Sequence, residues 1–166
     1  TFVLYQNRYS MKTKNTFCII AGFLNFFTFI LHLIGGQLDI VNPMMESSMP
    51  LQPMSEMLAA WHLVSVFLLL SSFYYLRYGF GYSSKSPSET VKMMSYCYIA
   101  FALVFIVISL VQGVFAPQWI LLLPIGILGL FGLKKADGTI VEAAKNTGIK
   151  IKGTRNPIFV IYNPSK

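Results

Sequence analysis

Charged side chains are scarce in this sequence of 166 residues, because only 11% of its residues are Asp, Glu, Lys or Arg. An ordinary soluble domain carries about 25% charged residues, so this composition argues against a soluble class. Three stretches, 15–38, 57–76 and 93–133, have no charged side chain at all. One helix needs roughly 20 apolar residues to cross a bilayer core, and the third stretch is long enough for two crossings. The sequence therefore predicts an integral membrane protein.

The sequence also lacks the motifs of common catalytic and nucleotide-binding sites. It has no phosphate-binding glycine loop, no His-Glu-x-x-His, no Gly-x-Ser-x-Gly and no Cys-x-x-Cys. No Asp, Glu, Lys or Arg lies in the middle of a predicted helix, whereas small proton-coupled exporters of similar size usually rely on a buried carboxylate. We therefore expect a non-catalytic protein, and independent ion-coupled transport is disfavoured.

Four transmembrane helices are predicted, near residues 15–35, 56–78, 92–115 and 118–134. Ser55 is expected to be the N-cap of the second helix. Gly113 and Pro117 divide the long third stretch, because glycine and proline interrupt helices and the flanking glutamines favour the membrane interface. The expected fold is an all-α, integral membrane four-helix bundle spanning 15–134.

The basic residues give the expected orientation. All thirteen Lys and Arg residues lie before the first helix, at or between the second and third, or after the fourth. The two other connections contain none, so the positive-inside rule predicts that both termini are cytoplasmic. The net charge of +7 then fits contact with an anionic inner leaflet, and no nucleic-acid partner is needed to explain it. Cys18 and Cys97 fall near the cytoplasmic side, where a disulfide is not expected.

The two ends of the chain differ from the predicted bundle. Residues 1–14 form a cytoplasmic N-terminal segment in which Met11 resembles a native start, and residues 135–166 form a basic cytoplasmic tail. Turn signals such as Asp137-Gly138 and β-prone runs near the C-terminus predict irregular structure and strands in that tail. It is too short to bury a core by itself, so we expect it to lie on anionic lipid or on a partner.

Small and polar residues form one face of the first predicted helix. At 100° per residue, one stripe contains Cys18, Gly22, Asn25, Thr28, His32 and Gly36. Such a stripe on an apolar helix is typical of a helix-packing face. In the fourth predicted helix, Gly126, Gly129 and Gly132 recur every three residues and predict close backbone approach.

The only two histidines, His32 and His62, are predicted to lie at similar depth in the outer half of the membrane. Gln112 and Gln118 are expected at the same level. Trp61 and Trp119 fit an outer aromatic belt as interface anchors. A second belt at the cytoplasmic side is predicted from six tyrosines: Tyr74, Tyr75, Tyr78, Tyr82, Tyr96 and Tyr98.

Three interpretations of the outer polar residues remain open. The favoured one is a polar network, formed by Asn25, Thr28, His32, His62, Gln112 and Gln118, that organises the bundle without a cofactor. The alternative is a metal or haem b site in which His32 and His62 are the ligands, with copper as the other candidate. A third is contact with a small ligand such as a quinone or a lipid headgroup.

Four short segments, "LHLIGG", "PMM", "AAWHL" and "APQW", resemble those of small four-helix bacterial inner-membrane proteins with no assigned activity. The resemblance covers residues 11 to about 134 and implies only the architecture and a bacterial inner-membrane location. The leading functional hypothesis is a non-catalytic accessory or interaction subunit with a membrane-protein partner or a homo-oligomeric assembly. The alternatives are a haem- or metal-binding redox protein and an oligomeric small-molecule transporter.

Overall fold

The computed structural model of the chain describes residues 14–81 and 87–146, and every regular element in these ranges is helical. Helix α1, Thr16–Gly36, continues through a π-helical turn, Gln37–Val41, into the short helix α2, Asn42–Met45. Three long helices follow: α3 over Leu51–Gly79, α4 over Pro87–Gln112 and α5 over Trp119–Asn146. The predicted all-helical fold is confirmed for the described residues.

Three segments are long and apolar enough to cross a membrane. They are Thr16–Met45, Leu51–Gly79 and Ser88–Gln112, and they correspond to the first three predicted spans. Many of their large apolar side chains are exposed, including Phe23 at 57%, Leu63 at 71% and Leu110 at 78%. Exposure on this scale is expected where lipid is the solvent.

The second long helix begins earlier than predicted. Pro50 occupies the N-cap position in an extended conformation, and α3 starts at Leu51. Pro53 is accommodated because the first-turn N–H groups of a helix have no intrahelical partner. Ser55 therefore lies inside the helix, where its hydroxyl donates to the Leu51 carbonyl oxygen at 2.8 Å. The prediction that Ser55 caps this helix was wrong.

The last helix continues beyond the predicted boundary at residue 134. Helix α5 runs to Asn146, through the Asp137-Gly138 pair that suggested a turn. The Lys, Ala and Glu residues around that pair favour helix, and this preference prevails over the local turn signal. The strands predicted nearer the C-terminus, and the segment before residue 14, fall outside the described residues.

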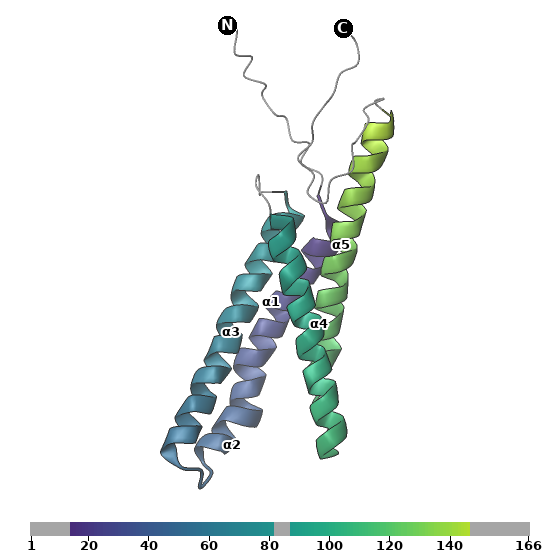
Figure 1. Ribbon diagram of the computed structural model, residues 1–166. Coiled ribbons are helices and arrows are strands. Elements are labelled where there is room, and N and C mark those ends of the chain that lie inside the picture. Colours follow the sequence, from purple (N-terminus) through teal and green to yellow (C-terminus); the bar gives the residue numbers. More distant parts are fainter. Residues whose placement is uncertain (1–13, 82–86, 147–166) are drawn as a thin grey trace, which may run out of the picture.

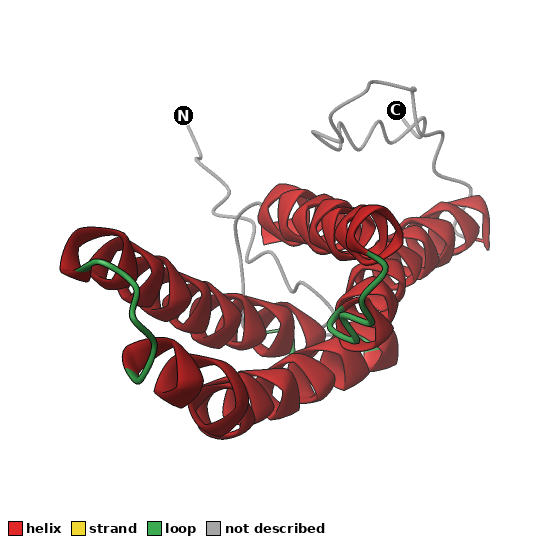
Figure 2. Cartoon of the chain, turned by 90° about the horizontal axis from the view of Figure 1, so that it is seen from below, coloured by secondary structure: helices red, strands yellow, loops and turns green. Residues whose placement is uncertain are grey.

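The long helices form two pairs that meet at one end and diverge at the other (Figure 1). Helix α1 packs against α3 and α4 packs against α5, while α1–α5 and α3–α4 contacts join the pairs. Seen from below, the connection after α2 and the connection between α4 and α5 lie apart from each other (Figure 2). We call residues 15–28, 65–80, 91–102 and 122–135 the closed end, and residues 29–64 and 103–121 the open end.

The apolar core lies at the closed end and takes residues from all four long helices. Its buried members are Cys18, Ala21, Leu68, Tyr75, Val91, Met94, Tyr98, Ala102, Leu122 and Ile125. The face predicted for α1 is the face that packs: Cys18, Gly22, Asn25 and Thr28 are buried, and His32 and Gly36 are half-buried. That prediction is confirmed.

The glycines of α5 allow this helix to approach its neighbours closely. A Cβ atom added at Gly129 would collide with Ser95 Oγ and lie 2.7 Å from the Tyr75 ring. At Gly132 it would lie 2.8 Å from Asn15 Oδ1, and at Gly126 it would lie 2.7 Å from the Ser95 carbonyl oxygen. The predicted role of these three glycines in close packing is confirmed.

Replacing Gly129→Ala is expected to destabilise the protein by about 1–3 kcal/mol, because the added methyl group overpacks the contact with Ser95 and Tyr75. Gly35→Ala is the matched control, since a Cβ at Gly35 meets nothing within 4 Å. The free energy of unfolding of each full-length variant in detergent, followed by circular dichroism, measures the difference. Equal stability of the two variants would contradict the close approach of α5.

Candidate functional site

A network of buried polar side chains joins α1, α3 and α4 at the closed end. Asn25 Nδ2 on α1 donates to Ser71 Oγ at 2.8 Å and to the Leu68 carbonyl oxygen at 3.2 Å, both on α3. The Tyr98 hydroxyl of α4 donates to Asn25 Oδ1 at 2.9 Å and lies 2.5 Å from Ser71 Oγ. We call Asn25, Ser71 and Tyr98 the polar triad. All three side chains are fully buried.

A second hydrogen bond, one turn nearer the helix ends, joins α3 to α4. The Tyr75 hydroxyl lies 2.9 Å from Ser95 Oγ, and the Ser95 hydroxyl donates to the Val91 carbonyl oxygen of its own helix at 2.7 Å. Gly129 of α5 packs against both side chains. The absence of a side chain at Gly129 therefore lets α5 cover this polar contact.

Asn15 links the start of α1 and the end of α3 to the middle of α5. Its Oδ1 accepts the Cys18 N–H at 3.2 Å, so it is the N-cap of α1. Its Nδ2 donates to the Gly132 carbonyl oxygen of α5 at 2.7 Å, and its backbone N–H donates to the Gly79 carbonyl oxygen of α3 at 2.8 Å. One residue thus satisfies polar groups on three helices.

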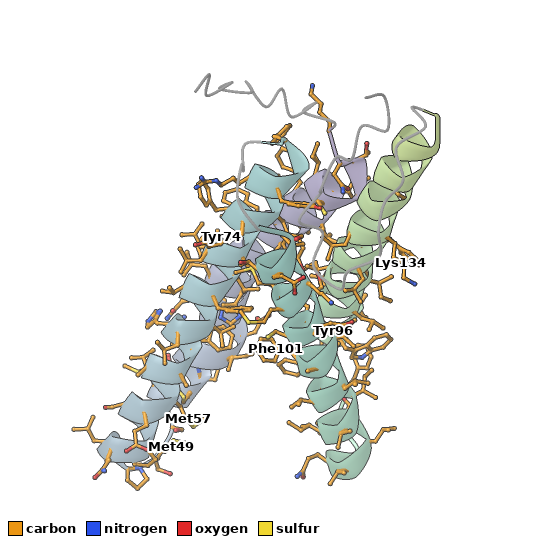
Figure 3. The ribbon with its side chains drawn as sticks, turned by 45° about the horizontal axis from the view of Figure 1, so that its top comes forward. Met49, Met57, Tyr74, Tyr96, Phe101 and Lys134 are labelled. Carbon is orange, nitrogen blue, oxygen red and sulfur yellow. The ribbon has the colours of Figure 1, made fainter. Side chains whose placement is uncertain are left out.

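Aromatic rings border the polar triad on the side of the open end. The Phe67 ring of α3 lies 5.6 Å from both the Tyr98 and the Phe101 rings of α4, between centroids. Figure 3 shows Phe101 near the point where the two helix pairs begin to separate. These rings place an apolar layer between the triad and the open end.

The closed-end network is suited to holding helices together. It contains no formal charge, and each of its side-chain polar atoms has a hydrogen-bond partner. Among the side chains that the structure describes, no three His, Cys, Asp or Glu residues are grouped to hold a metal ion. Cys18 and Cys97 are free thiols, and Cys18 is buried. The chemistry of this network is hydrogen bonding between helices.

The predicted histidine pair lies on the α1–α3 pair at the open end. The His32 ring stacks on the Trp61 ring, with centroids 3.9 Å apart, and His32 Nε2 lies 3.3 Å from the Trp61 carbonyl oxygen. His62 follows Trp61 on α3 and is exposed. Metal or haem ligation through His32 Nε2 would require its contact with the Trp61 carbonyl oxygen to break.

The structure does not bring the predicted glutamines to the histidines. Gln112 is exposed at the end of α4, and Gln118 is half-buried just before α5, so both belong to the other helix pair. The pairs diverge at this end (Figure 1). Thr28 is buried at the closed end, where its hydroxyl donates to the Leu24 carbonyl oxygen of its own helix at 2.9 Å. Of the six predicted polar residues, Asn25 alone joins the polar triad.

Both tryptophans pack against protein. Trp61 lies over His32 and over Gly36, where a Cβ atom would collide with its ring, and Trp119 packs against the core cluster. Trp61 Nε1 and Gln118 Oε1 are the two buried side-chain polar atoms without a hydrogen-bond partner among the described residues. Their role as interface anchors stays a prediction.

The prediction of a tyrosine belt at the cytoplasmic side was wrong for two of its residues. Tyr74 and Tyr96 are exposed, as a belt requires, but Tyr75 and Tyr98 are fully buried. The sequence did carry a signal for them, because Leu68, Ser72, Tyr75 and Gly79 on α3 follow the spacing of one helix face. Ser95, Tyr98 and Ala102 do the same on α4.

Comparison of the chain with models of protein families, with curated proteins and with solved structures gives no match.

Proposed function

We propose that this protein is a four-span membrane protein of a bacterial inner membrane and acts there as a non-catalytic accessory or interaction subunit. The three long apolar helices support the membrane location. Helix α5 supports a fourth span, because it packs along both α4 and α1 and contributes Leu122 and Ile125 to the core. The bacterial location rests on the resemblance of short sequence segments.

The distribution of charge supports a cytoplasmic location for both termini. Arg77, Lys92, Lys134 and Lys135 lie at the closed end and Lys14 directly precedes it, whereas residues 35–56 of the open end have no Lys or Arg and contain Asp39, Glu46 and Glu56. The positive-inside rule assigns the end with basic residues to the cytoplasm. The closed end would then face the cytoplasm.

Cysteine labelling in a Cys18→Ala, Cys97→Ala background tests this orientation. A membrane-impermeant maleimide is expected to label Met49→Cys in intact spheroplasts and Lys135→Cys only after lysis, since these exposed positions belong to the open end and the closed end, respectively. Labelling of Lys135→Cys, and not of Met49→Cys, in intact spheroplasts would reverse the orientation.

One observation carries the proposed role: the polar groups of the bundle are used within the chain at the closed end, while the open end presents apolar side chains. Beyond Phe101, the face of α4 that meets α3 continues through Val104, Ile108 and Val111, which are 54%, 45% and 75% exposed. On α3 the corresponding face continues from Phe67 through Val64, which is 45% exposed. These faces suit packing against an apolar transmembrane helix of a partner.

The same observation disfavours transport by this chain alone. A transport pathway requires polar or ionisable groups to carry a solute through the hydrocarbon region. The open-end faces just described supply valine, isoleucine and phenylalanine, and the buried polar groups of the closed end already bond to one another. Substrate-dependent turnover by the purified protein in proteoliposomes would contradict a non-catalytic, non-transporting role.

Photocrosslinking in the native membrane tests the interaction role. A benzoylphenylalanine at Ile108 is expected to form a discrete adduct with one protein, because this position lies on the face that we assign to the partner. Leu103 is the control, since it is 53% exposed on the opposite side of the same helix and should crosslink to lipid. An adduct of twice the chain mass would identify a second copy as the partner. Identical protein adducts from both positions, or none from Ile108, would contradict the proposal.

A further inference from the structure

A surface groove lies on α3 close to the end of the helix. Phe73, Leu76, Arg77 and Phe80 line it, and its volume is about 480 Å³. Phe73 is 58% exposed, and Arg77 is exposed, so the groove opens away from the core. Leu76 also packs against α1 at Gly22, which fixes the base of the groove. The groove is therefore built on the well-packed part of the α1–α3 pair.

The groove combines apolar walls with one cationic side chain. Three of its lining residues are hydrocarbon or aromatic, and Arg77 is the basic residue in the last turn of α3. A guanidinium group can bind phosphate oxygens through two parallel hydrogen bonds in a fixed planar geometry. The chemistry of the groove thus suits a molecule with a phosphate at one end and hydrocarbon at the other.

The charge around the groove favours an anionic molecule. Lys14 and Lys134 lie at the same end of the helices, and Asn15 holds the start of α1 against Gly79 at the end of α3. Three carboxylates, Asp39, Glu46 and Glu56, lie at the open end. Among the described side chains of this region, the acidic one is Glu89, in the first turn of α4. The described basic residues therefore exceed the described acidic ones at the end that contains the groove.

The level of the groove matches the headgroup region of a bilayer. Tyr74 and Tyr78 occupy the same two turns of α3, and aromatic residues of this kind concentrate at membrane interfaces. From there the apolar helix extends through Leu70, Leu69 and Val66 toward the open end, all exposed. A ligand with its phosphate at Arg77 would therefore have its hydrocarbon part along a lipid-facing surface.

We propose that this groove is a binding site for one anionic phospholipid. The phosphate is held by the Arg77 guanidinium, and the upper part of an acyl chain packs between Phe73, Leu76 and Phe80. The proposed orientation determines which leaflet supplies the lipid, but the groove chemistry does not depend on it. Failure of the lipid experiment leaves the crosslinking experiment at Ile108 unaffected, so the two proposals fail separately.

Fluorescence quenching in nanodiscs tests this site. The full-length Phe73→Trp variant is placed in phosphatidylcholine that contains a minor fraction of acyl-brominated phosphatidylglycerol or acyl-brominated phosphatidylcholine. The native Trp61 and Trp119 lie at the open end, and the parent protein measured alongside corrects for them. Brominated phosphatidylglycerol is expected to quench the tryptophan introduced by this substitution more strongly than brominated phosphatidylcholine. Equal quenching by the two lipids would overturn the proposal.

Variants at the basic residues separate a specific site from general surface charge. In the Phe73→Trp background, R77Q should weaken the preference for phosphatidylglycerol over phosphatidylcholine about five-fold. This is the effect of one basic residue near an anionic surface. R77K should restore part of the preference, since lysine keeps the charge but lacks the guanidinium fork. K134Q, on α5 at the same end, is the control and should lose much less of this preference than R77Q. Equal losses in R77Q and K134Q would overturn the site in favour of diffuse attraction.

A competition arm distinguishes a lipid headgroup from free phosphate. Inorganic phosphate is compared with chloride at equal ionic strength, and it is expected to leave the quenching of the introduced tryptophan by brominated phosphatidylglycerol unchanged. The reason is that the apolar walls contribute nothing to the binding of free phosphate. Selective displacement by phosphate would assign the groove to a soluble anion and overturn the lipid proposal. Circular dichroism of each variant confirms that the helices are retained.

Discussion

The carboxamide of Asn25 must find its hydrogen-bond partners inside the protein, and the arrangement of the helices follows from this requirement. In hydrocarbon an unpaired amide costs several kcal/mol, and water cannot satisfy it. On α1, Asn25 reaches Ser71 and the Leu68 carbonyl of α3 with its N–H groups, while its oxygen accepts from Tyr98 of α4. The Asn25 N–H groups can bond to α3, and its oxygen to α4, only where these two helices converge on α1. The glycines of α5 then let the fourth helix close over the adjoining Tyr75–Ser95 contact.

This constraint acts at one end of the molecule, and it gives the two ends different surfaces. At the closed end polar groups are satisfied, glycines allow close approach, and Asn15 ties α1 to α3 and α5. At the open end the two helix pairs separate and present apolar side chains, with the His32–Trp61 stack confined to the α1–α3 pair. The basic residues of the closed end suit contact with an anionic membrane face, and in the proposed role the open apolar faces pack against another helix.

Much of the fold could be predicted from the sequence, because a bilayer imposes simple patterns on a chain. Charge-free stretches located the first three long helices, and the spacing of small residues identified the packing faces of α1 and α5. The polar triad was only partly predicted, since Asn25 belonged to the expected stripe but Tyr98 was assigned to an interfacial belt. Tyrosine fits either environment, and its burial depends on a partner from another helix. The distance of Gln112 from His32 likewise depends on the angle between helix pairs, which no local pattern encodes.

The packing of α1 against α4 depends on a direct energetic link between Asn25 and Tyr98, and a double-mutant cycle measures this link. The cycle compares the unfolding free energies in detergent of Asn25→Ala, Tyr98→Phe and the double variant of the full-length protein. A coupling of about 0.6 kcal/mol, and no more than about 1.7 kcal/mol, is expected for a hydrogen bond between membrane helices. The control cycle of Asn25→Ala with Tyr96→Phe, whose side chain is exposed on α4, should show no coupling. Additive effects for Asn25 and Tyr98 would contradict the central role of the triad.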